Sequence, residues 1–283
     1  MVISNIGTWM SDVGSGWLMT TLVADPFMVA LVQAATTAPI FLLALPAGAV
    51  ADIVDRRRLL ITVNSLMAVA AVVFATLVAL ERVTSGLLLL FTFLLGAGAA
   101  FIAPAWQAIV PQLVSREKLA SAIALNSMGI NVSRAIGPAL AGVLIVALGI
   151  AAPFALNALS FIAIVAALVW WRAESTQVSQ LPSERIGEAM LNGLRYAWNS
   201  AALRATLVRA AAFFLFASAY WALLPVIAKT SLGGDARLYG LLLGCVGAGA
   251  VLGALLLPKV KPRLAADRTR RAAATAGAGE RCH

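Results

Sequence analysis

The residues of this chain that could do chemistry are few, and the most conspicuous of them interrupts an apolar stretch near the N-terminus. Asn5, Thr8, Asp12 and Ser15 recur at helical spacing, so they share one face of a helix. A charged side chain inside a membrane costs about 3 kcal/mol and usually faces a cavity or a partner. Because loss of water favours the neutral form of a carboxyl group, Asp12 is a candidate proton carrier. A structural ion pair, or a shallower Asp12 in a frayed helix, is the alternative.

Arg134 is the natural partner for that carboxylate. It shares a helical face with Ser127, Asn131 and Pro138 inside another apolar stretch. A pair between Asp12 and Arg134 would neutralise both charges, and it could equally form a gate that protonation or substrate opens. Replacing Arg134 by alanine should matter more than the same change at Asn131, because losing one partner strands a buried charge.

A third group of charges lies between two uncharged stretches, where residues 48–58 read GAVADIVDRRR. Gly48 and Asp52 are one helical turn apart, so the glycine would let a neighbouring helix approach the carboxylate. Asp52 could accept hydrogen bonds at a helix N-terminus or pair with an arginine. The basic residues that follow the second acid, Asp55, hold a loop on the cytoplasmic side; they are Arg56, Arg57 and Arg58. An ordinary positively charged loop explains the segment as well.

Glycine and proline mark the stretch that contains Arg134, at Gly137, Pro138 and Gly142. Proline removes one helix hydrogen bond and bends the helix. Small residues recur at a spacing of four through Gly129, Ser133, Gly137 and Ala141, which suits a tight helix pair. Ordinary packing explains this stripe equally well.

Elsewhere, amide and aromatic side chains stand out. Gln107 is a candidate cavity residue, whereas its neighbour Trp106 fits the membrane–water interface, where tryptophan is enriched. The pairs Phe213-Phe214 and Tyr220-Trp221 could contact an aromatic substrate, although lipid contact is favoured.

Composition indicates which elements must position these side chains. The chain is 61% hydrophobic and 12% charged, against about 25% charged residues in soluble domains, and its mean hydropathy is +0.93. A bilayer core needs roughly 20 residues of helix, and the apolar runs do not alternate as β-barrel strands do. The sequence therefore predicts an all-α polytopic membrane protein with spans near 2–22, 28–51, 59–80, 85–107, 119–147, 150–171, 205–228 and 238–258.

The net charge of +9 is a signal of topology rather than of nucleic-acid binding. If Met1 is inside, the basic residues concentrate in the loops on that side, which assigns both termini to the cytoplasm. The single histidine, His283, leaves no material for a zinc site or a Ser-His-Asp triad. We therefore expect neither a cofactor nor enzymatic activity, and the lack of clustered carboxylates also argues against a membrane-embedded enzyme.

Four segments follow from this division. Residues 1–171 should form a six-helix bundle, and residues 172–204 a cytoplasmic linker with an amphipathic helix. Residues 205–258 should hold two further spans. The basic, alanine- and glycine-rich tail 259–283 should be disordered.

Together these motifs resemble the major facilitator superfamily, and within it the enterobactin-exporter-like branch of drug and siderophore exporters. The resemblance covers residues 1 to about 260. Ile53 and Asp55 depart from the superfamily loop, where a basic residue and a glycine are usual. The matching segments are 4–10, Trp17, 48–52, 55–58, Pro104-Ala105, 111–114, Asn126-Ser127, Asn131 and 134–142.

The resemblance implies two six-helix bundles, of which this chain would hold the first and the opening two helices of the second, as a C-terminally truncated member. It implies alternating access in the cell (inner) membrane, with protons driving efflux of a small amphiphilic siderophore or drug. Asn5, Thr8 and Asp12 would then face the central cavity, and the helix would bend at Gly137-Pro138. A non-transporting fragment that only inserts and associates in the membrane is the alternative.

Overall fold

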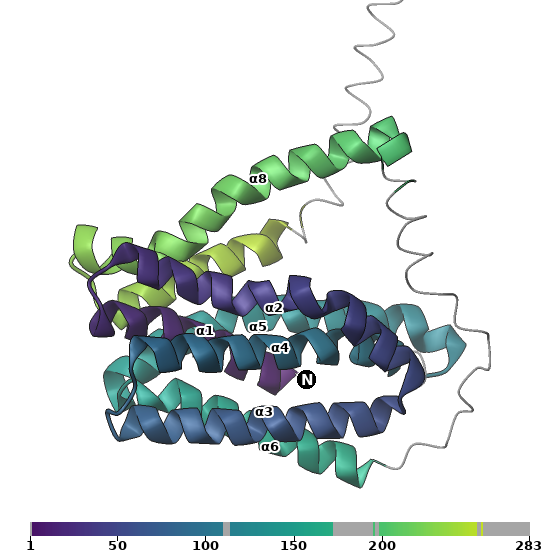
Figure 1. The fold of residues 1–283 in the computed structure, drawn as a ribbon, viewed down its shortest axis with the longest axis horizontal. Coiled ribbons are helices and arrows are strands. Elements are labelled where there is room, and N and C mark those ends of the chain that lie inside the picture. Colours follow the sequence, from purple (N-terminus) through teal and green to yellow (C-terminus); the bar gives the residue numbers. More distant parts are fainter. Residues whose placement is uncertain (1, 110–113, 172–194, 196–197, 254–255, 257–283) are drawn as a thin grey trace, which may run out of the picture.

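The chain folds into long helices that lie side by side. The computed structural model describes residues 2–109, 114–171, 195, 198–253 and 256, and this part of the chain contains no β-strand. Six helices come first: α1 (Val2–Leu22), α2 (Pro26–Ile53), α3 (Arg56–Ala79), α4 (Ser85–Ile109), α5 (Leu119–Leu148) and α6 (Ala151–Trp170). A 3-10 turn, η2 (Arg116–Lys118), precedes α5. They run roughly along one axis, as Figure 1 shows.

Two more long helices follow. The helix α8 (Ala201–Val226) continues directly into the π-helical turn η3 (Ile227–Ser231), and another helix covers Ala236–Gly253. In Figure 1, α8 crosses the other helices at an angle and leaves them towards its N-terminus. Most of the predicted linker 172–204 and the whole predicted tail 259–283 lie outside the described residues.

Membrane-length helices number seven rather than the predicted eight, among the residues that the structure describes. Six of the seven are α2 to α6 and the continuous helix formed by α8 and η3, and the seventh is Ala236–Gly253. The exception is α1, which is 21 residues long. Its polar residues, Asp12 among them, lower its hydropathy below that of a typical span. The helix boundaries otherwise fall within a few residues of those expected.

Local signals explain where helices begin and end. The Asp25 carboxylate accepts a hydrogen bond from the Phe27 amide at 2.9 Å, and Pro26 stands in the first turn of α2. Gly149 separates α5 from α6 with a φ of 90°, which favours glycine. The break predicted between the spans 119–147 and 150–171 is therefore confirmed.

The polar helix α1 lies in the interior, with α5 and α6 as its main neighbours and further contacts to α2, α4 and α8. Glycines permit this close packing. A methyl group at Gly7 would come within 2.9 Å of the Asn157 amide oxygen in α6. One at Gly137 in α5 would come within 2.6 Å of Trp9 Cβ. Small residues allow such contact where lipid offers no hydrophobic drive for helix association.

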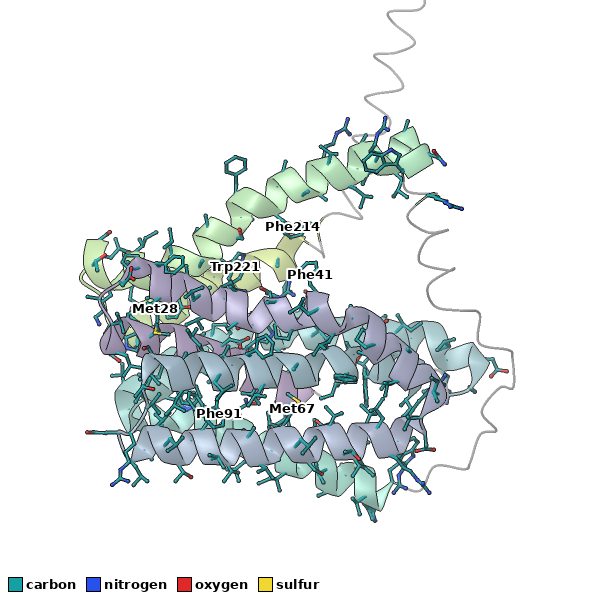
Figure 2. All side chains as sticks on the ribbon, viewed as in Figure 1. Met28, Phe41, Met67, Phe91, Phe214 and Trp221 are labelled. Carbon is teal, nitrogen blue, oxygen red and sulfur yellow. The ribbon has the colours of Figure 1, made fainter. Side chains whose placement is uncertain are left out.

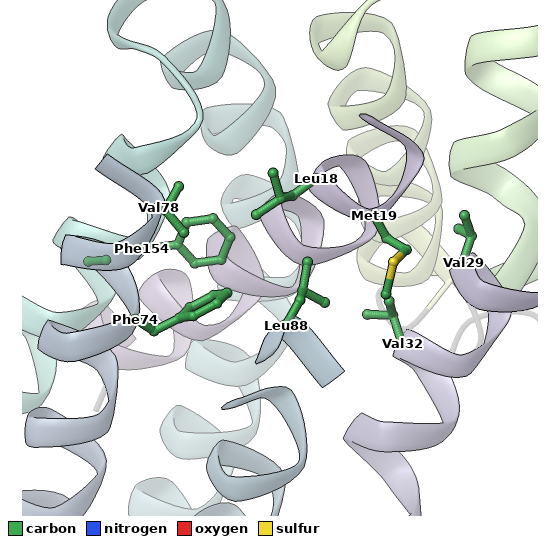
Figure 3. Close-up of a cluster of buried hydrophobic side chains, with 9 residues drawn as sticks. Leu18, Met19, Val29, Val32, Phe74, Val78, Leu88 and Phe154 are labelled. Carbon is green, nitrogen blue, oxygen red and sulfur yellow. The ribbon is translucent and has the colours of Figure 1, made fainter. Parts of the chain in front are cut away.

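Aromatic and aliphatic side chains fill one end of the bundle. Phe74 meets Phe154 edge to face, with ring centroids 4.9 Å apart, and Leu88 lies beside them in Figure 3. We call this group the Phe74 cluster; its members are Leu18, Met19, Val29, Val32, Phe74, Ala75, Val78, Leu88 and Phe154. They come from the end of α1, the start of α2, the end of α3, and the starts of α4 and α6.

The outer faces of the helices are apolar. Phe41 in α2 is 83% exposed, and Phe214 in α8 is 67% exposed. Figure 2 labels both side chains, Phe41 on α2 and Phe214 on α8. Such a surface suits contact with lipid chains rather than with water.

Candidate functional site: a polar cavity in the helix bundle

Helices α1 to α6 enclose a cavity of about 620 Å³. Ser15, Phe74 and Asn157 line it on the side of the Phe74 cluster, and Ile109, Asn126 and Trp171 line it at the end where α4 and α6 finish. The opposite end of the bundle is filled by the Phe74 cluster. The cavity therefore reaches towards one end of the molecule, the end that carries Arg56 to Arg58.

Four of the six predicted cavity residues line this space. Asn5, Thr8 and Asp12 do so from successive turns of α1, and Gln107 does so from the last turn of α4. Asn131 and Arg134 are not among the lining residues. The Asn131 side-chain amide instead donates to the backbone carbonyl of Ser127, 2.8 Å away and one turn back in α5.

Asp12 and Arg134 do not form the ion pair that the sequence suggested. The Arg134 guanidinium lies over the Trp9 ring, 5.2 Å from its centroid. Attraction between a cation and an aromatic face accounts for this position. Asp12 is half-buried, and no hydrogen bond or ion pair joins it to another residue that the structure describes.

Further polar side chains line the cavity that the sequence analysis did not predict. Asn64 in α3, Thr92 in α4 and Asn157 in α6 are buried and line it. Asn64 donates to the Leu60 carbonyl at 2.7 Å, and the Thr92 hydroxyl donates to the Leu88 carbonyl at 2.8 Å. Each lies within an uncharged, mainly apolar stretch, and a polar residue in such a stretch was the available signal.

Trp106 also differs from its predicted place at the interface. It lines the cavity, and its indole N–H donates to the Asn126 side-chain oxygen in α5 at 3.3 Å. An indole N–H that is partly buried needs an acceptor, and Asn126 supplies one. This hydrogen bond ties α4 to α5 at the end of the bundle where the cavity finishes.

The segment 48–58 has a different local structure from the one expected. A methyl group at Gly48 would meet nothing within 4 Å, so no neighbouring helix approaches there. Asp52 lies in the last turn of α2, and its side chain is outside the description. The carboxylate that caps a helix is Asp55, which accepts from the Arg58 amide at 2.7 Å at the start of α3.

Two of the three arginines bind the ends of other helices. Arg57 donates to the carbonyls of Leu168 and Val169 in α6, both at 3.0 Å. Arg56 donates to the Ala108 carbonyl at the end of α4, at 3.4 Å. Cations stabilise helix C-termini, whose last carbonyls have no partner within the helix. The arginines thus join the α2–α3 loop to α4 and α6, a role beyond setting membrane orientation.

The two glycines of α5 that flank Pro138, Gly137 and Gly142, lie against two different helices. Gly137 faces α1, whereas a methyl group at Gly142 would come within 2.7 Å of the Ala236 carbonyl oxygen. On the facing helix 236–253, a methyl group at Gly240 would come within 2.5 Å of the Pro138 carbonyl oxygen. One at Gly247 would lie directly against Ala135 Cα. The helix 236–253 therefore packs backbone to backbone on α5, whereas a methyl group at Gly249 or Gly253 would meet nothing within 4 Å.

A polar contact at residues that do not line the cavity links α1 to η3, the turn that continues α8. The Lys229 ammonium in η3 donates to the Thr20 carbonyl near the end of α1 and lies 6.0 Å from the Trp17 ring centroid. Trp17 also stacks on Tyr239 with centroids 6.2 Å apart. Trp17 and Tyr239 also pack with apolar side chains, among them Val13, Leu224 and Leu243. No pattern in the sequence predicted that these residues would meet.

No group of three or more histidine, cysteine, aspartate or glutamate side chains in the described ranges could hold a metal ion. The site consists instead of one carboxylate, several amides and hydroxyls, and aromatic rings. Apolar membrane-length helices around a polar cavity are the architecture of a membrane transporter.

Comparison with known proteins agrees with this class. The sequence profile of the family described as transmembrane secretion effector matches residues 1–279. The chain belongs to this family, which is a branch of the major facilitator superfamily and comprises transporters rather than enzymes. It is a multi-pass membrane protein.

The chain is also similar to a curated protein, the staphyloferrin A transporter of Staphylococcus aureus. The two are 26% identical over 259 residues, which is 90% of this chain and 64% of the relative. This chain thus spans about two thirds of the length of the relative that it matches.

Proposed function

We propose that the chain belongs to a proton-coupled exporter that moves a small amphiphilic compound, a siderophore or a drug, by alternating access. The arrangement that carries the proposal is a polar cavity that reaches one end of the bundle while the Phe74 cluster fills the other. A cavity with one filled end is what one half-cycle of alternating access requires. Family membership and the name of the staphyloferrin A transporter support the direction and the kind of cargo.

The end of the bundle that carries Arg56 to Arg58 is the cytoplasmic end in this proposal, and both termini are then cytoplasmic. The cavity accordingly receives its cargo from the cytoplasm. Residues 1–171 act as the first bundle, and residues 205–258 supply the first two helices of the second. The contact between α5 and the helix 236–253 then joins the two bundles away from the cytoplasm.

Asp12 is the proposed proton carrier. It lines the cavity from the middle of α1, and no described residue neutralises it by an ion pair. A carboxyl group in such a place can exchange a proton with the cavity as its surroundings change. Arg134 is not part of this step in the proposal, because its guanidinium lies over Trp9.

Transport by the purified chain in proteoliposomes tests the proposal. Vesicles with an acidic interior and an alkaline exterior should take up a fluorescent amphiphilic dye, since outward proton flow would drive dye inward. A protonophore should abolish this uptake, and Asp12→Asn should reduce it to the level of protein-free vesicles. Asp25→Asn is the matched control, because Asp25 is an exposed helix cap outside the cavity and asparagine also caps helices.

Two results would separate the parts of this proposal. Dye uptake that Asp12→Asn leaves unchanged would remove Asp12 from the coupling path. A parent chain that is inserted in the vesicles but moves no dye under any gradient would favour the alternative, a chain that only inserts and associates in the membrane.

A further inference from the structure

The N-terminal half of α8 has few neighbours, and in Figure 1 it lies apart from the other helices. Among the described side chains of α8, the buried ones are Leu224 and Pro225, both near its C-terminal end. The side chains from Arg204 to Arg209 are all exposed. The surrounding membrane therefore contacts this half of the helix directly.

The charges of α8 and η3 indicate their level in the bilayer. Residues 210–228 contain no charged side chain, and Arg209 and Lys229 flank them. At 1.5 Å per residue this stretch is about 28 Å long, close to the hydrocarbon core of about 30 Å. Arg209 then lies at the edge of the hydrocarbon, and Arg204 lies about 7 Å further out, among the lipid headgroups. Trp198 is exposed just before the helix, and tryptophan is enriched at this level of a membrane.

The guanidinium groups of Arg204 and Arg209 are available to a ligand. No hydrogen bond, ion pair or ring contact joins either of them to another residue that the structure describes. Residues 195–231 contain neither aspartate nor glutamate. Arg56 and Arg57 at the same end of the molecule differ, because they already donate to helix carbonyls. A free guanidinium is suited to phosphate, which it can bind through two parallel hydrogen bonds.

An apolar track continues from Arg209 along α8. Phe213 and Phe216 follow on the same helical face, and Tyr220 lies one turn beyond them. All three rings are exposed. The track is about 16 Å long and runs from the headgroup level into the hydrocarbon. A cationic group followed by such a track matches a phospholipid, whose phosphate and acyl chain have the same order, rather than a soluble phosphate.

We propose that the N-terminal half of α8 binds an anionic phospholipid. Arg204 and Arg209 hold its phosphate, and its acyl chain lies along Phe213 and Phe216. In the proposed orientation this lipid belongs to the cytoplasmic leaflet. Its binding fixes the depth of a helix half that the other described helices leave exposed. The inference does not depend on the export function, because these residues lie outside the cavity.

Native mass spectrometry of the purified full chain in a neutral detergent tests the site. Phosphatidylglycerol and phosphatidylcholine with identical acyl chains are the probes, since they differ in net charge and share their apolar part. The parent should bind phosphatidylglycerol at least about tenfold more tightly. Attraction to anionic lipid is worth about fivefold for each arginine. Arg204→Gln with Arg209→Gln should therefore lower this affinity by at least about tenfold, and lysine at both positions should hold it within about threefold.

Arg82→Gln with Arg237→Gln is the matched control, because it removes two charges from exposed arginines at the opposite end of the molecule. Each of these arginines has an acidic neighbour in the sequence, Glu81 or Asp235, which weakens its attraction for an anion. The affinity for phosphatidylglycerol should therefore fall by about twofold at most. Equal losses in the two double variants would overturn the inference, as would equal affinities of the parent for the two lipids.

Photochemical labelling checks the position of the lipid. Phosphatidylglycerol with a photoreactive acyl chain, in nanodiscs of phosphatidylcholine, should label the peptide that contains Phe213 and Phe216. Label confined to other helices would overturn the inference. A p-benzoylphenylalanine in place of Phe216 should join to lipid in native membranes, and capture of a protein there instead would also overturn it. If the glutamine variant does not fold, the comparison of the two lipids on the parent chain still decides.

Discussion

At the scale of single residues, the arginines after α2 show how one side chain can serve two purposes. Their charge marks the cytoplasmic side in the proposed orientation. Two of them also supply donors to carbonyls that end α4 and α6, with Arg57 making two hydrogen bonds. Because these carbonyls have no helical partner, the arginines stabilise the ends of helices far away in sequence.

Replacing Arg57 by alanine should lower the free energy of unfolding by about 1–3 kcal/mol, since two hydrogen bonds from a charged donor are lost. Thermal unfolding in detergent would measure the change. Arg58→Ala is the control, because the Arg58 side chain makes no hydrogen bond to a described residue and it is exposed. Equal loss in the two variants would show that charge alone matters, not the contact with α6.

Sequence reasoning located some of the cavity residues because periodicity is local. Asn5, Thr8 and Asp12 share a face at any orientation of α1. The position of the Arg134 side chain could not be predicted, because Asp12 and Trp9 share one face of α1. Only tertiary packing decides which of the two the guanidinium contacts. Asn64, Thr92 and Asn157 belong to three different helices, and only the packing of those helices brings them to one cavity.

At the scale of elements, glycines decide which helices touch. Gly7 allows α1 to pack closely against α6, and Gly137 allows α5 to pack closely against α1. Gly240 and Gly247 allow the helix 236–253 to pack closely against another face of α5. Helix limits were predictable from charges, prolines and glycines, but the partner of each glycine was not. Gly48 illustrates this, because its small size is used by no neighbour.

The contact between α5 and the helix 236–253 can be tested by cross-linking. The Cβ position at Gly244 lies 3.2 Å from Ala139 Cβ, slightly under the separation of about 3.8 Å in a disulfide. Ala139→Cys with Gly244→Cys should therefore form a disulfide under mild oxidation, once Cys245 and Cys282 are replaced by serine. Mass spectrometry of tryptic peptides would detect it.

Ala139→Cys with Gly249→Cys is the matched control pair, since the Cβ position at Gly249 has nothing within 4 Å. Equal cross-linking of both pairs would contradict the observed packing. In the proposed cycle these helices separate, so the disulfide should also reduce dye transport, and dithiothreitol should restore it.

At the scale of the whole molecule, the asymmetry between the two ends governs access. The Phe74 cluster fills one end, and the Lys229 contact joins α1 to α8 towards that same end. The cavity finishes at the other end, beside Trp106 and Trp171. Water and solutes should therefore reach the cavity from the arginine side alone in this conformation.

Thiol labelling with a membrane-impermeant maleimide would check both access and orientation. In a background without native cysteines, Ala103→Cys in the cavity wall should react in inside-out vesicles and stay unmodified in intact cells. Glu117→Cys beside the start of α5 should behave in the same way, and Glu81→Cys after α3 should react in intact cells only. The reverse pattern for the two glutamate positions would place the termini outside.

The interior position of α1 has a consequence for how the protein is made. This helix is the least apolar of the long ones, and the helices that cover it, α5 and α6, follow much later in the chain. At ribosomal speeds the delay is on the order of ten seconds. During that time the insertion machinery must shield the polar face of α1 from the lipid. Substitutions that make α1 still more polar should therefore reduce the yield of inserted protein before they alter anything that the finished molecule does.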